Sequence, residues 1–381
     1  MVDAAAAVHN RANALEDLYD EIHERSMFPF WATSEGVEHD EIKQLMATQK
    51  AIPHLWRWRE DILPLLERAA ELITMNDSER RSLILINPGL APRRATVSTM
   101  YTAYRLNDAD EIMPPHKHSP NAIRLGLTGT GNFTGVEGEN VVFGPGDMVL
   151  TPNDAWHNHG TVGHQQATNL SVLDLPLVET LNAIHFDHDY MEEEGGKLVK
   201  KKEQSARYPA DYSQAVYGKG GMVPRFVDQH RGGGLSSPMY VYRWAAMEEI
   251  LQKHKDWDGD PHEALMVEYT DPFRGGPVFK TMTFFMQMLR PGEKTLALKQ
   301  TASLLVSPFR GEGASIVDGQ RVDWDQFDTL AVPGGSWCSH ENTSATEPLY
   351  LFVASDEPVL KALSLYKKWG RTPDGDVARL A

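Results

Sequence analysis

Two pairs of histidines, each with one residue between its members, are the side chains of this sequence best suited to chemistry: His116/His118 and His157/His159. Imidazole is the commonest metal ligand among side chains. Alternate residues of a β-strand point to the same side, so His116 and His118 would face one interior. His157 follows the strand-like stretch GDMVLTP and can return beside them. We therefore expect His116, His118 and His157 to bind one metal ion.

The spacing alone leaves the identity of the metal open. Three neutral histidines can hold Zn²⁺, Mn²⁺, Ni²⁺ or Fe²⁺. His159 lies two residues beyond His157 and is expected to face the same interior, where it would carry a proton or donate a hydrogen bond. His185 and His188, in HFDHDY, lie outside any strand pattern and are predicted to be surface residues.

The elements that must position these histidines are short strands. Apolar stretches alternate with Gly, Pro, Asn and Asp turns from residue 83 to 185, and the pattern returns from 261 to 365. Such spacing is typical of an antiparallel barrel or jelly roll. Residues 125–159 align with 306–340, and each segment has a Gly-x-Gly and a proline five residues before the third-ligand position. We infer a mainly β protein with an internal repeat of two barrels.

These patterns divide the chain into five segments. Residues 1–82 are expected to form an N-terminal helical arm, with apolar residues at helical spacing over 9–25 and 59–74. The predicted remainder is a metal-binding barrel over 83–185, an irregular linker over 186–260, a second barrel over 261–365 and a C-terminal tail over 366–381.

The second barrel lacks the residues for the same chemistry. The alignment places Leu298 and Gln300 at the positions of the first histidine pair and Cys338 at the third-ligand position. His340 then corresponds to His159. One thiol without a pair of histidines is a poor metal site, so we predict a structural barrel without metal.

Composition excludes several classes of function. The net charge of −16 opposes binding to a phosphate backbone, so no nucleic-acid partner is expected. No apolar run approaches the length of a membrane span, and the first residues lack a signal-peptide pattern, so no membrane partner is expected. The single cysteine, Cys338, excludes a disulfide within the chain, and a cytoplasmic location is predicted.

The stretches HKHSPNAIRLGLTG (116–129) and GDMVLTPNDAWHNH (146–159) resemble the two cupin motifs. The usual first motif carries a glutamate ligand shortly after its second histidine, where this sequence has Ala122 and Ile123. Together with AIPHLWRW and SERRSLILINPGL, these stretches look like the gentisate 1,2-dioxygenase family, which includes salicylate and 1-hydroxy-2-naphthoate dioxygenases. The resemblance extends from the N-terminal helix to about residue 360.

The resemblance implies a bicupin, with two double-stranded β-helix (jelly-roll) barrels, that binds Fe(II) and assembles as a homotetramer. It implies a small aromatic hydroxy acid as substrate, whose ring O₂ cleaves between the carbons bearing the carboxylate and the hydroxyl. Arg124, six residues after His118 and expected on the same strand, matches the arginine that holds the carboxylate. Arg80 matches a second pocket arginine, whereas Arg81 is predicted to form a surface ion pair. Tyr101 and Ala103 match positions beside the ring, and Tyr101 would bond the substrate hydroxyl or pack against the ring.

Two positions depart from the family pattern. Arg105 stands where a glutamine is expected, and Ser171 stands where relatives carry an aspartate, with Asp174 three residues later. The Tyr101/Ala103 pattern favours gentisate as substrate and maleylpyruvate as product. The two departures leave salicylate and 1-hydroxy-2-naphthoate as alternatives. A non-catalytic cupin that binds a small molecule is the alternative from another class.

Overall fold

The computed structural model describes residues 13–22, 24–27, 29, 50–73, 81–220, 222–225 and 235–381. Contacts divide the chain into two compact units, 1–49 and 50–381. In the first unit, residues 13–22 are helical, within the segment where the sequence predicts a helix, and Tyr19 is buried against Leu15 and Ile22. The elements described below all belong to the second unit.

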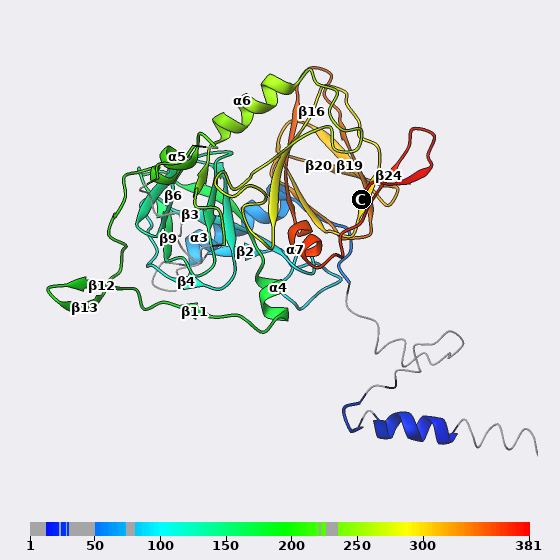
Figure 1. Ribbon diagram of the computed structural model, residues 1–381, viewed down its shortest axis with the longest axis horizontal. Helices are drawn as coiled ribbons and strands as arrows, with labels where there is room; N and C mark the ends of the chain where they lie inside the picture. Colours follow the sequence, from blue (N-terminus) through cyan, green and yellow to red (C-terminus); the bar gives the residue numbers. More distant parts are fainter. Residues whose placement is uncertain are drawn as a thin grey trace, which may run out of the picture. The chain divides into compact units, whose positions relative to one another are not determined.

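The first barrel, drawn in cyan to green in Figure 1, is built from two antiparallel sheets. A short pair of strands, β4 (Lys117–His118) and β11 (Phe186–Asp187), adjoins them. The strand order of the larger sheet is β14 (Val241–Tyr242), β8 (Met148–Thr151), β5 (Ala122–Thr128), β10 (Ala167–Leu173), β3 (Tyr101–Asn107) and β2 (Ser82–Ile84). The order of the smaller sheet is β7 (Glu139–Phe143), β6 (Asn132–Val136) and β9 (His157–Thr161).

The second barrel repeats this arrangement. The strand order of its larger sheet is β1 (His54–Trp56), β21 (Thr329–Val332), β18 (Leu304–Arg310), β23 (Leu349–Ser355), β16 (Thr283–Leu289) and β15 (Leu265–Glu268). The order of its smaller sheet is β20 (Gln320–Trp324), β19 (Gly313–Val317), β22 (Trp337–Asn342), β17 (Leu298–Gln300), β24 (Lys368–Arg371) and β25 (Val377–Arg379). The segment before the first barrel and the C-terminal residues thus both add strands to the second barrel.

The strand registers confirm the internal repeat and the bicupin fold. His116 forms a β-bridge with His157, and the corresponding residues Leu298 and Cys338 pair in the second barrel. Two residues further along the strand, His159 lies opposite Thr134, and its counterpart His340 lies opposite Ser315, so both face a hydroxyl side chain. The alignment of 125–159 with 306–340 therefore places structurally equivalent residues together.

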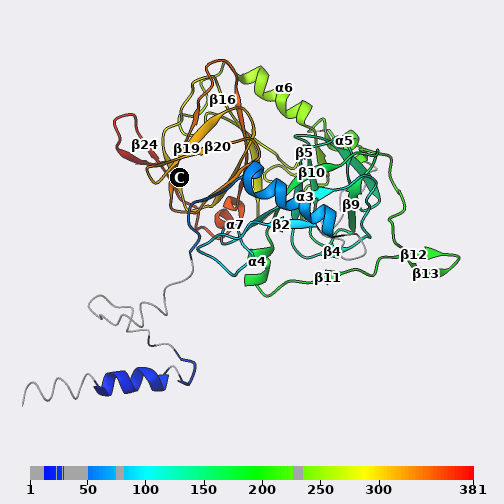
Figure 2. The ribbon, with the colours of Figure 1, turned by 180° about the vertical axis from the view of Figure 1, so that it is seen from behind.

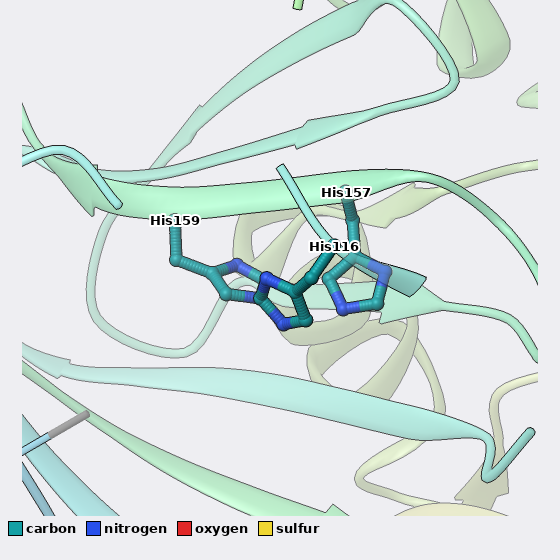
Figure 3. A group of neighbouring side chains, drawn as sticks. All are labelled: His116, His157 and His159. Atoms are coloured by element: carbon teal, nitrogen blue, oxygen red, sulfur yellow. The ribbon is translucent and has the colours of Figure 1, made fainter. Parts of the chain in front are cut away.

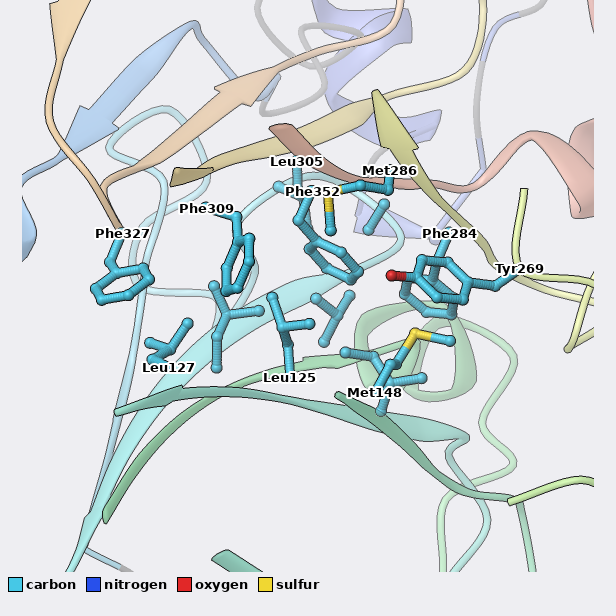
Figure 4. Close-up of a cluster of buried hydrophobic side chains, with 14 of the residues drawn as sticks. Leu125, Leu127, Met148, Tyr269, Phe284, Met286, Leu305, Phe309, Phe327 and Phe352 are labelled. Atoms are coloured by element: carbon cyan, nitrogen blue, oxygen red, sulfur yellow. The ribbon is translucent and has the colours of Figure 1, made fainter. Parts of the chain in front are cut away.

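The main hydrophobic core lies between the larger sheets of the two barrels. Each strand turns one set of alternating side chains into its own barrel and the other set toward the neighbouring barrel. Figure 4 shows Leu125 and Leu127 of β5 facing Phe284, Phe309 and Phe352, and all five side chains are buried. Burial of each large apolar side chain contributes roughly 1.5–3 kcal/mol, so this core holds the two barrels together.

Helices cover the ends and edges of the sheets. The helix predicted over 59–74 corresponds to a π-helical turn, η2 (Trp58–Ile62), followed by α3 (Leu63–Leu72), whose Leu66 is buried in the main core (Figure 2). Helices α4 (Leu175–Thr180) and α7 (Glu357–Ala362) each follow the last long strand of a barrel. No helix in the described ranges is long and apolar enough to cross a membrane.

Residues 186–260 contain more regular structure than their sequence pattern indicates. Besides β11 and β14, they form the hairpin β12 (Met191–Glu194) and β13 (Lys197–Lys200) and the helices α5 (Tyr212–Tyr217) and α6 (Trp244–His254). Strand β14 is only two residues long and is defined by pairing with β8, a contact distant in sequence. Sequence periodicity cannot reveal so short a strand. The segment bounds predicted from sequence remain predictions.

A buried carboxyl group in the second barrel makes stability depend on pH. Asp356 is 3% exposed, and its burial raises its pKa to about 6. The folded chain therefore retains a proton that the unfolded chain releases near pH 4. Because the folded state binds more protons between these pH values, this group makes stability fall as pH rises from about 4 to 6.

We expect Asp356→Asn to remove this dependence. Between pH 4 and pH 7, the difference of about two pKa units between folded and unfolded Asp356 should cost the parent roughly 3 kcal/mol of unfolding free energy. The variant should not show this loss. Urea unfolding of the metal-free proteins at both pH values measures the difference. Parallel pH profiles for parent and variant would contradict the buried ionisation of Asp356.

Candidate active site

The histidine pairs meet inside the first barrel. His116 and His157 exchange two backbone hydrogen bonds of 2.9 Å, which places the segment before β4 beside the start of β9. Their ring centroids lie 4.4 Å apart, and the rings of His118 and His157 lie 4.6 Å apart. All four histidines are buried. Two-residue periodicity on two neighbouring strands therefore brings the predicted ligands together.

The closest group of potential ligand atoms differs from the predicted set in one member. The ligand atoms of His116, His157 and His159 lie within 4.8 Å of one another, and Figure 3 shows these rings converging. His118 is not part of this closest group, although its ring adjoins that of His157. Distance alone therefore does not decide whether His118 or His159 is the third ligand.

Hydrogen bonds at the Nδ1 atoms distinguish His118 from His159. His118 Nδ1 lies 2.8 Å from the Pro120 carbonyl oxygen, and His157 Nδ1 lies 2.7 Å from that of Ala155. His116 Nδ1 has a similar, longer contact of 3.3 Å with the Pro114 carbonyl oxygen. A carbonyl oxygen only accepts, so each Nδ1 carries the proton and each Nε2 presents a lone pair. Such outer contacts orient histidine ligands in metal sites.

His159 has a different partner. Its Nδ1 lies 3.1 Å from the hydroxyl of Thr134, which can donate or accept, so the tautomer of His159 is not fixed. In the second barrel His340 makes the same contact, 2.9 Å, with the hydroxyl of Ser315. Because this contact recurs where no histidine pair exists, it is a property of the fold. This favours His118 as ligand and leaves His159 able to exchange a proton.

The electrostatics keep His157 and His159 neutral. Burial lowers the pKa of His157 well below its ordinary value, and His116, His118 and Arg124 lower it further. Burial also lowers the pKa of His159, with additional contributions from Arg124 and His157. Neutral imidazole is the form that binds a metal ion.

A cavity of about 290 Å³ opens beside the histidines. Its wall is the inner face of the larger sheet, where Ala103, Ser171 and Arg124 are direct neighbours on β3, β10 and β5. Tyr101 and Arg105 continue the same face of β3. The structure thus brings together in one cavity all the predicted substrate-binding residues that it describes: Tyr101, Ala103, Arg105, Arg124 and Ser171, with His116, His118 and His159.

The position of Arg124 is reached by a different route from the one predicted. His118 ends β4 and Arg124 lies on β5, so the two residues are not on one strand. The turn at 119–121 separates the strands, and its proline and asparagine interrupt the extended chain. Arg124 nevertheless faces the cavity, is 8% exposed and donates to the Thr151 hydroxyl at 3.2 Å.

Of the two adjacent arginines Arg80 and Arg81, the structure describes only Arg81. Arg80 lies outside the described residues, so its role stays a prediction. Arg81 was predicted to form a surface ion pair, but it is 6% exposed and pairs with Asp108 and Glu111. It also donates to two carbonyl oxygens near the end of α3, so it fastens that helix to the barrel.

The segment around β11 was missed as part of the site. Phe186 pairs with His118, lines the cavity and contacts the His118 ring at 5.7 Å between centroids. His185 and His188 are exposed, as predicted, but the His188 ring lies 6.0 Å from that of His116. The only sequence signal was the aromatic Phe186 between polar residues, which is too weak to predict a strand.

The second barrel offers different groups at the equivalent place. Leu298, Gln300, Cys338 and His340 line a cavity of about 40 Å³, room for roughly three water molecules. Burial raises the pKa of Cys338 to about 12 and lowers that of His340 to about 4, so both groups are neutral near pH 7. A thiol must lose its proton to bind a metal ion, and burial opposes that loss.

Paired jelly-roll barrels with histidines on facing strands define a cupin protein, and residues 106–173 match the family described as Cupin domain. The chain is 31% identical to 5-aminosalicylate 1,2-dioxygenase from Comamonas sp over 93% of its length and 90% of the relative. It is 30% identical to gentisate 1,2-dioxygenase from Streptomyces sp over 92% of this chain and 94% of that one.

Salicylate 1,2-dioxygenase from Pseudoaminobacter salicylatoxidans, solved as an adduct with gentisate, has a similar structure, with a TM-score of 0.79 and 26% identity over 94% of each chain. The chain belongs to the gentisate 1,2-dioxygenase family and is a ring-cleaving dioxygenase.

Proposed function

We propose that this enzyme binds Fe(II) through His116, His118 and His157 and cleaves gentisate to maleylpyruvate with one O₂. The observation that carries the proposal is the joint position of the histidine cluster and Arg124 beside one cavity of about 290 Å³. That volume is near the lower end for small-molecule sites and suits an acid with a single ring.

The residues present fit a metal ion. His157 Nε2 is buried and has no hydrogen-bond partner among the described residues, an arrangement that is costly unless a ligand occupies it. Three neutral imidazoles leave the charge of a divalent ion uncompensated. A substrate carboxylate and phenolate would supply the missing negative charge. When bound, iron would provide coordination positions for these oxygens and for O₂ and would allow electrons to pass from the substrate to O₂.

Arg124 supplies the orienting charge for the substrate. A guanidinium group holds a carboxylate through charge-assisted hydrogen bonds, which are strong where water is excluded. Its direct neighbour on β10 is Ser171, where a carboxylate would compete for the guanidinium. A serine at this position, unlike a carboxylate, does not compete with the substrate for the guanidinium group of Arg124. Arg105, on the same face two residues beyond Ala103, adds a second positive charge to the wall.

The remaining cavity residues act on the ring and on protons. Ala103 leaves space for the ring against the sheet, and Tyr101 can donate its hydroxyl proton to a substrate oxygen. His159 Nε2 is buried and has no partner in the described part of the chain, so it can accept the proton that the substrate hydroxyl loses. Phe186 contacts the His118 ring and lines the cavity, where its apolar ring would limit the access of water.

We expect gentisate to give a kcat/KM at least about tenfold above that of salicylate, roughly 1.4 kcal/mol in activation free energy. The second hydroxyl, para to the first, makes the ring easier to oxidise. Oxygen uptake by the iron-loaded enzyme, with the near-ultraviolet absorbance of the product, measures each substrate. The panel should contain gentisate, 5-aminosalicylate, salicylate and 1-hydroxy-2-naphthoate.

A higher kcat/KM for salicylate or 1-hydroxy-2-naphthoate than for gentisate would overturn the substrate assignment. Arg105→Gln and Ser171→Asp, which restore the expected family residues, then identify the position responsible. Absence of oxygen uptake with every substrate, in protein with full iron content, would favour a binding protein. A homotetrameric assembly and a cytoplasmic location belong to the same proposal. The assembly is supported by the resemblance, and the location is supported by the single cysteine, Cys338.

A further inference from the structure

Asp174 links the two barrels at the edge of the metal site. It follows β10 and stands at the N-cap position of α4, yet its carboxylate makes no capping hydrogen bond. Instead the carboxylate accepts from the Asn121 backbone N–H at 2.8 Å and from the Asn121 side chain at 2.9 Å. It also accepts from the hydroxyl of Thr281, two residues before the start of β16 in the second barrel, at 2.5 Å. Asp174 is 1% exposed, and hydrogen bonds to a buried carboxylate are strong.

Asn121 belongs to the turn that fixes the orientation of His118. This turn connects β4 to β5. Its Pro120 carbonyl oxygen accepts from His118 Nδ1 at 2.8 Å, the contact that directs Nε2 of His118 away from the turn. The Asn121 side chain also accepts from the Asn153 N–H at 3.0 Å. A continuous chain of hydrogen-bonded groups therefore leads from Thr281 through Asp174 and the turn to His118.

The second barrel contains the same link in the opposite direction. Asp356, at the N-cap of α7 and again without a capping bond, accepts from the Ser303 N–H at 2.7 Å. It also accepts from the hydroxyl of Thr99, in the first barrel, at 2.5 Å. The Ser303 side chain accepts from the Gly334 N–H, as Asn121 does from Asn153. Here Gln300 stands at the position of His118, so this link holds no histidine.

We propose that Thr281 of the second barrel is a positioning residue for the metal ligand His118, acting through Asp174 and the 119–121 turn. This inference rests on the proposed role of His118 as a ligand. The second barrel thereby contributes to a metal site that it does not itself contain. Outer groups that orient a ligand change metal affinity by about 10- to 100-fold when removed.

The pseudo-symmetry of the two links supplies a matched control. Thr281→Val and Thr99→Val each replace a hydroxyl by a methyl group of similar size and leave a buried aspartate short of one donor. Both variants should lower the melting temperature of the metal-free protein by a similar few degrees. Only Thr281→Val should weaken Fe(II) binding, by at least about tenfold, in chelator competition under argon. Thr281→Ser, which keeps the hydroxyl, should restore the affinity to within about twofold.

Equal Fe(II) affinities in Thr281→Val and Thr99→Val would overturn the positioning role, whether both are unchanged or both are lowered. If Thr281→Val does not fold, Thr281→Ala and Thr99→Ala provide the same comparison. The proposed ligand set is tested separately by His118→Ala. If that variant retains full Fe(II) affinity, the ligand assignment is wrong. If it loses affinity while Thr281→Val keeps it, the ligand assignment stands and only the role of Thr281 is wrong.

Discussion

His118→Ala is expected to lose stoichiometric iron and all measurable ring cleavage, whereas His159→Ala is expected to keep the iron and lose turnover. The two residues compete for the third ligand position by distance, because the ligand atoms of His159 lie closer to those of His116 and His157. The Nδ1 contacts favour His118, whose proton is fixed on Nδ1 by a carbonyl oxygen. His159 instead faces a hydroxyl, as His340 does in the second barrel.

Iron content per chain, measured after anaerobic reconstitution with Fe(II), decides between the two residues. The parent should hold one iron per chain, because the second barrel offers Leu298, Gln300 and a neutral Cys338. His116→Ala and His157→Ala should behave like His118→Ala. His340→Ala is the matched control for His159→Ala, since it removes the equivalent imidazole from the barrel that lacks a histidine pair, and its activity should match the parent.

The iron content and turnover of the variants distinguish the possible ligand sets. If His118→Ala retains one iron and near-normal turnover while His159→Ala loses both, the ligands are His116, His157 and His159. Two irons in the parent would show that the second barrel also binds metal. Circular dichroism of the metal-free variants checks that the barrel is folded, because every affected side chain is buried.

The meeting of the histidine pairs and the residues of the cavity wall could be predicted from sequence because both depend on local periodicity. Alternation along one strand places Tyr101, Ala103 and Arg105 on one face, and no knowledge of the partner strands is needed. The repeat was visible because glycines and prolines recur at matching positions in the two halves. Pairing of Leu298 with Cys338, as of His116 with His157, shows how closely that alignment follows the fold.

What the sequence could not show are contacts between distant segments. Strand β11 is two residues long and exists through its pairing with β4, so Phe186 gave no strand signal. Arg81 is adjacent to Arg80 in sequence, but its burial is decided by Asp108 and Glu111 beyond β3. The link from Thr281 to Asp174 joins residues of different barrels. Threonine and aspartate are common in turns, so neither residue stands out in the sequence.

Arg124→Met is expected to lower kcat/KM for gentisate by about 10- to 100-fold while iron content stays at the parental level. Methionine keeps much of the length and apolar volume of the side chain but removes the charge. A charge-assisted hydrogen bond contributes about 1.5–3 kcal/mol, which corresponds to this range. Iron should be retained because Arg124 is not one of the proposed ligands, and its guanidinium donates a hydrogen bond to the Thr151 hydroxyl. Steady-state oxygen uptake gives kcat/KM, and metal analysis gives the iron content.

Two further arginines test whether the carboxylate is held by Arg124 in particular. Arg105 shares the cavity wall but already donates to the Met113 sulfur at 2.7 Å, so Arg105→Met should have a smaller effect. Arg80→Met tests the second pocket arginine that the family resemblance implies. Substrate affinity measured under argon should weaken in Arg124→Met for gentisate and salicylate alike, since both carry the carboxylate. An unchanged kcat/KM in Arg124→Met, with a large loss in Arg80→Met or Arg105→Met, would assign the carboxylate to that arginine instead.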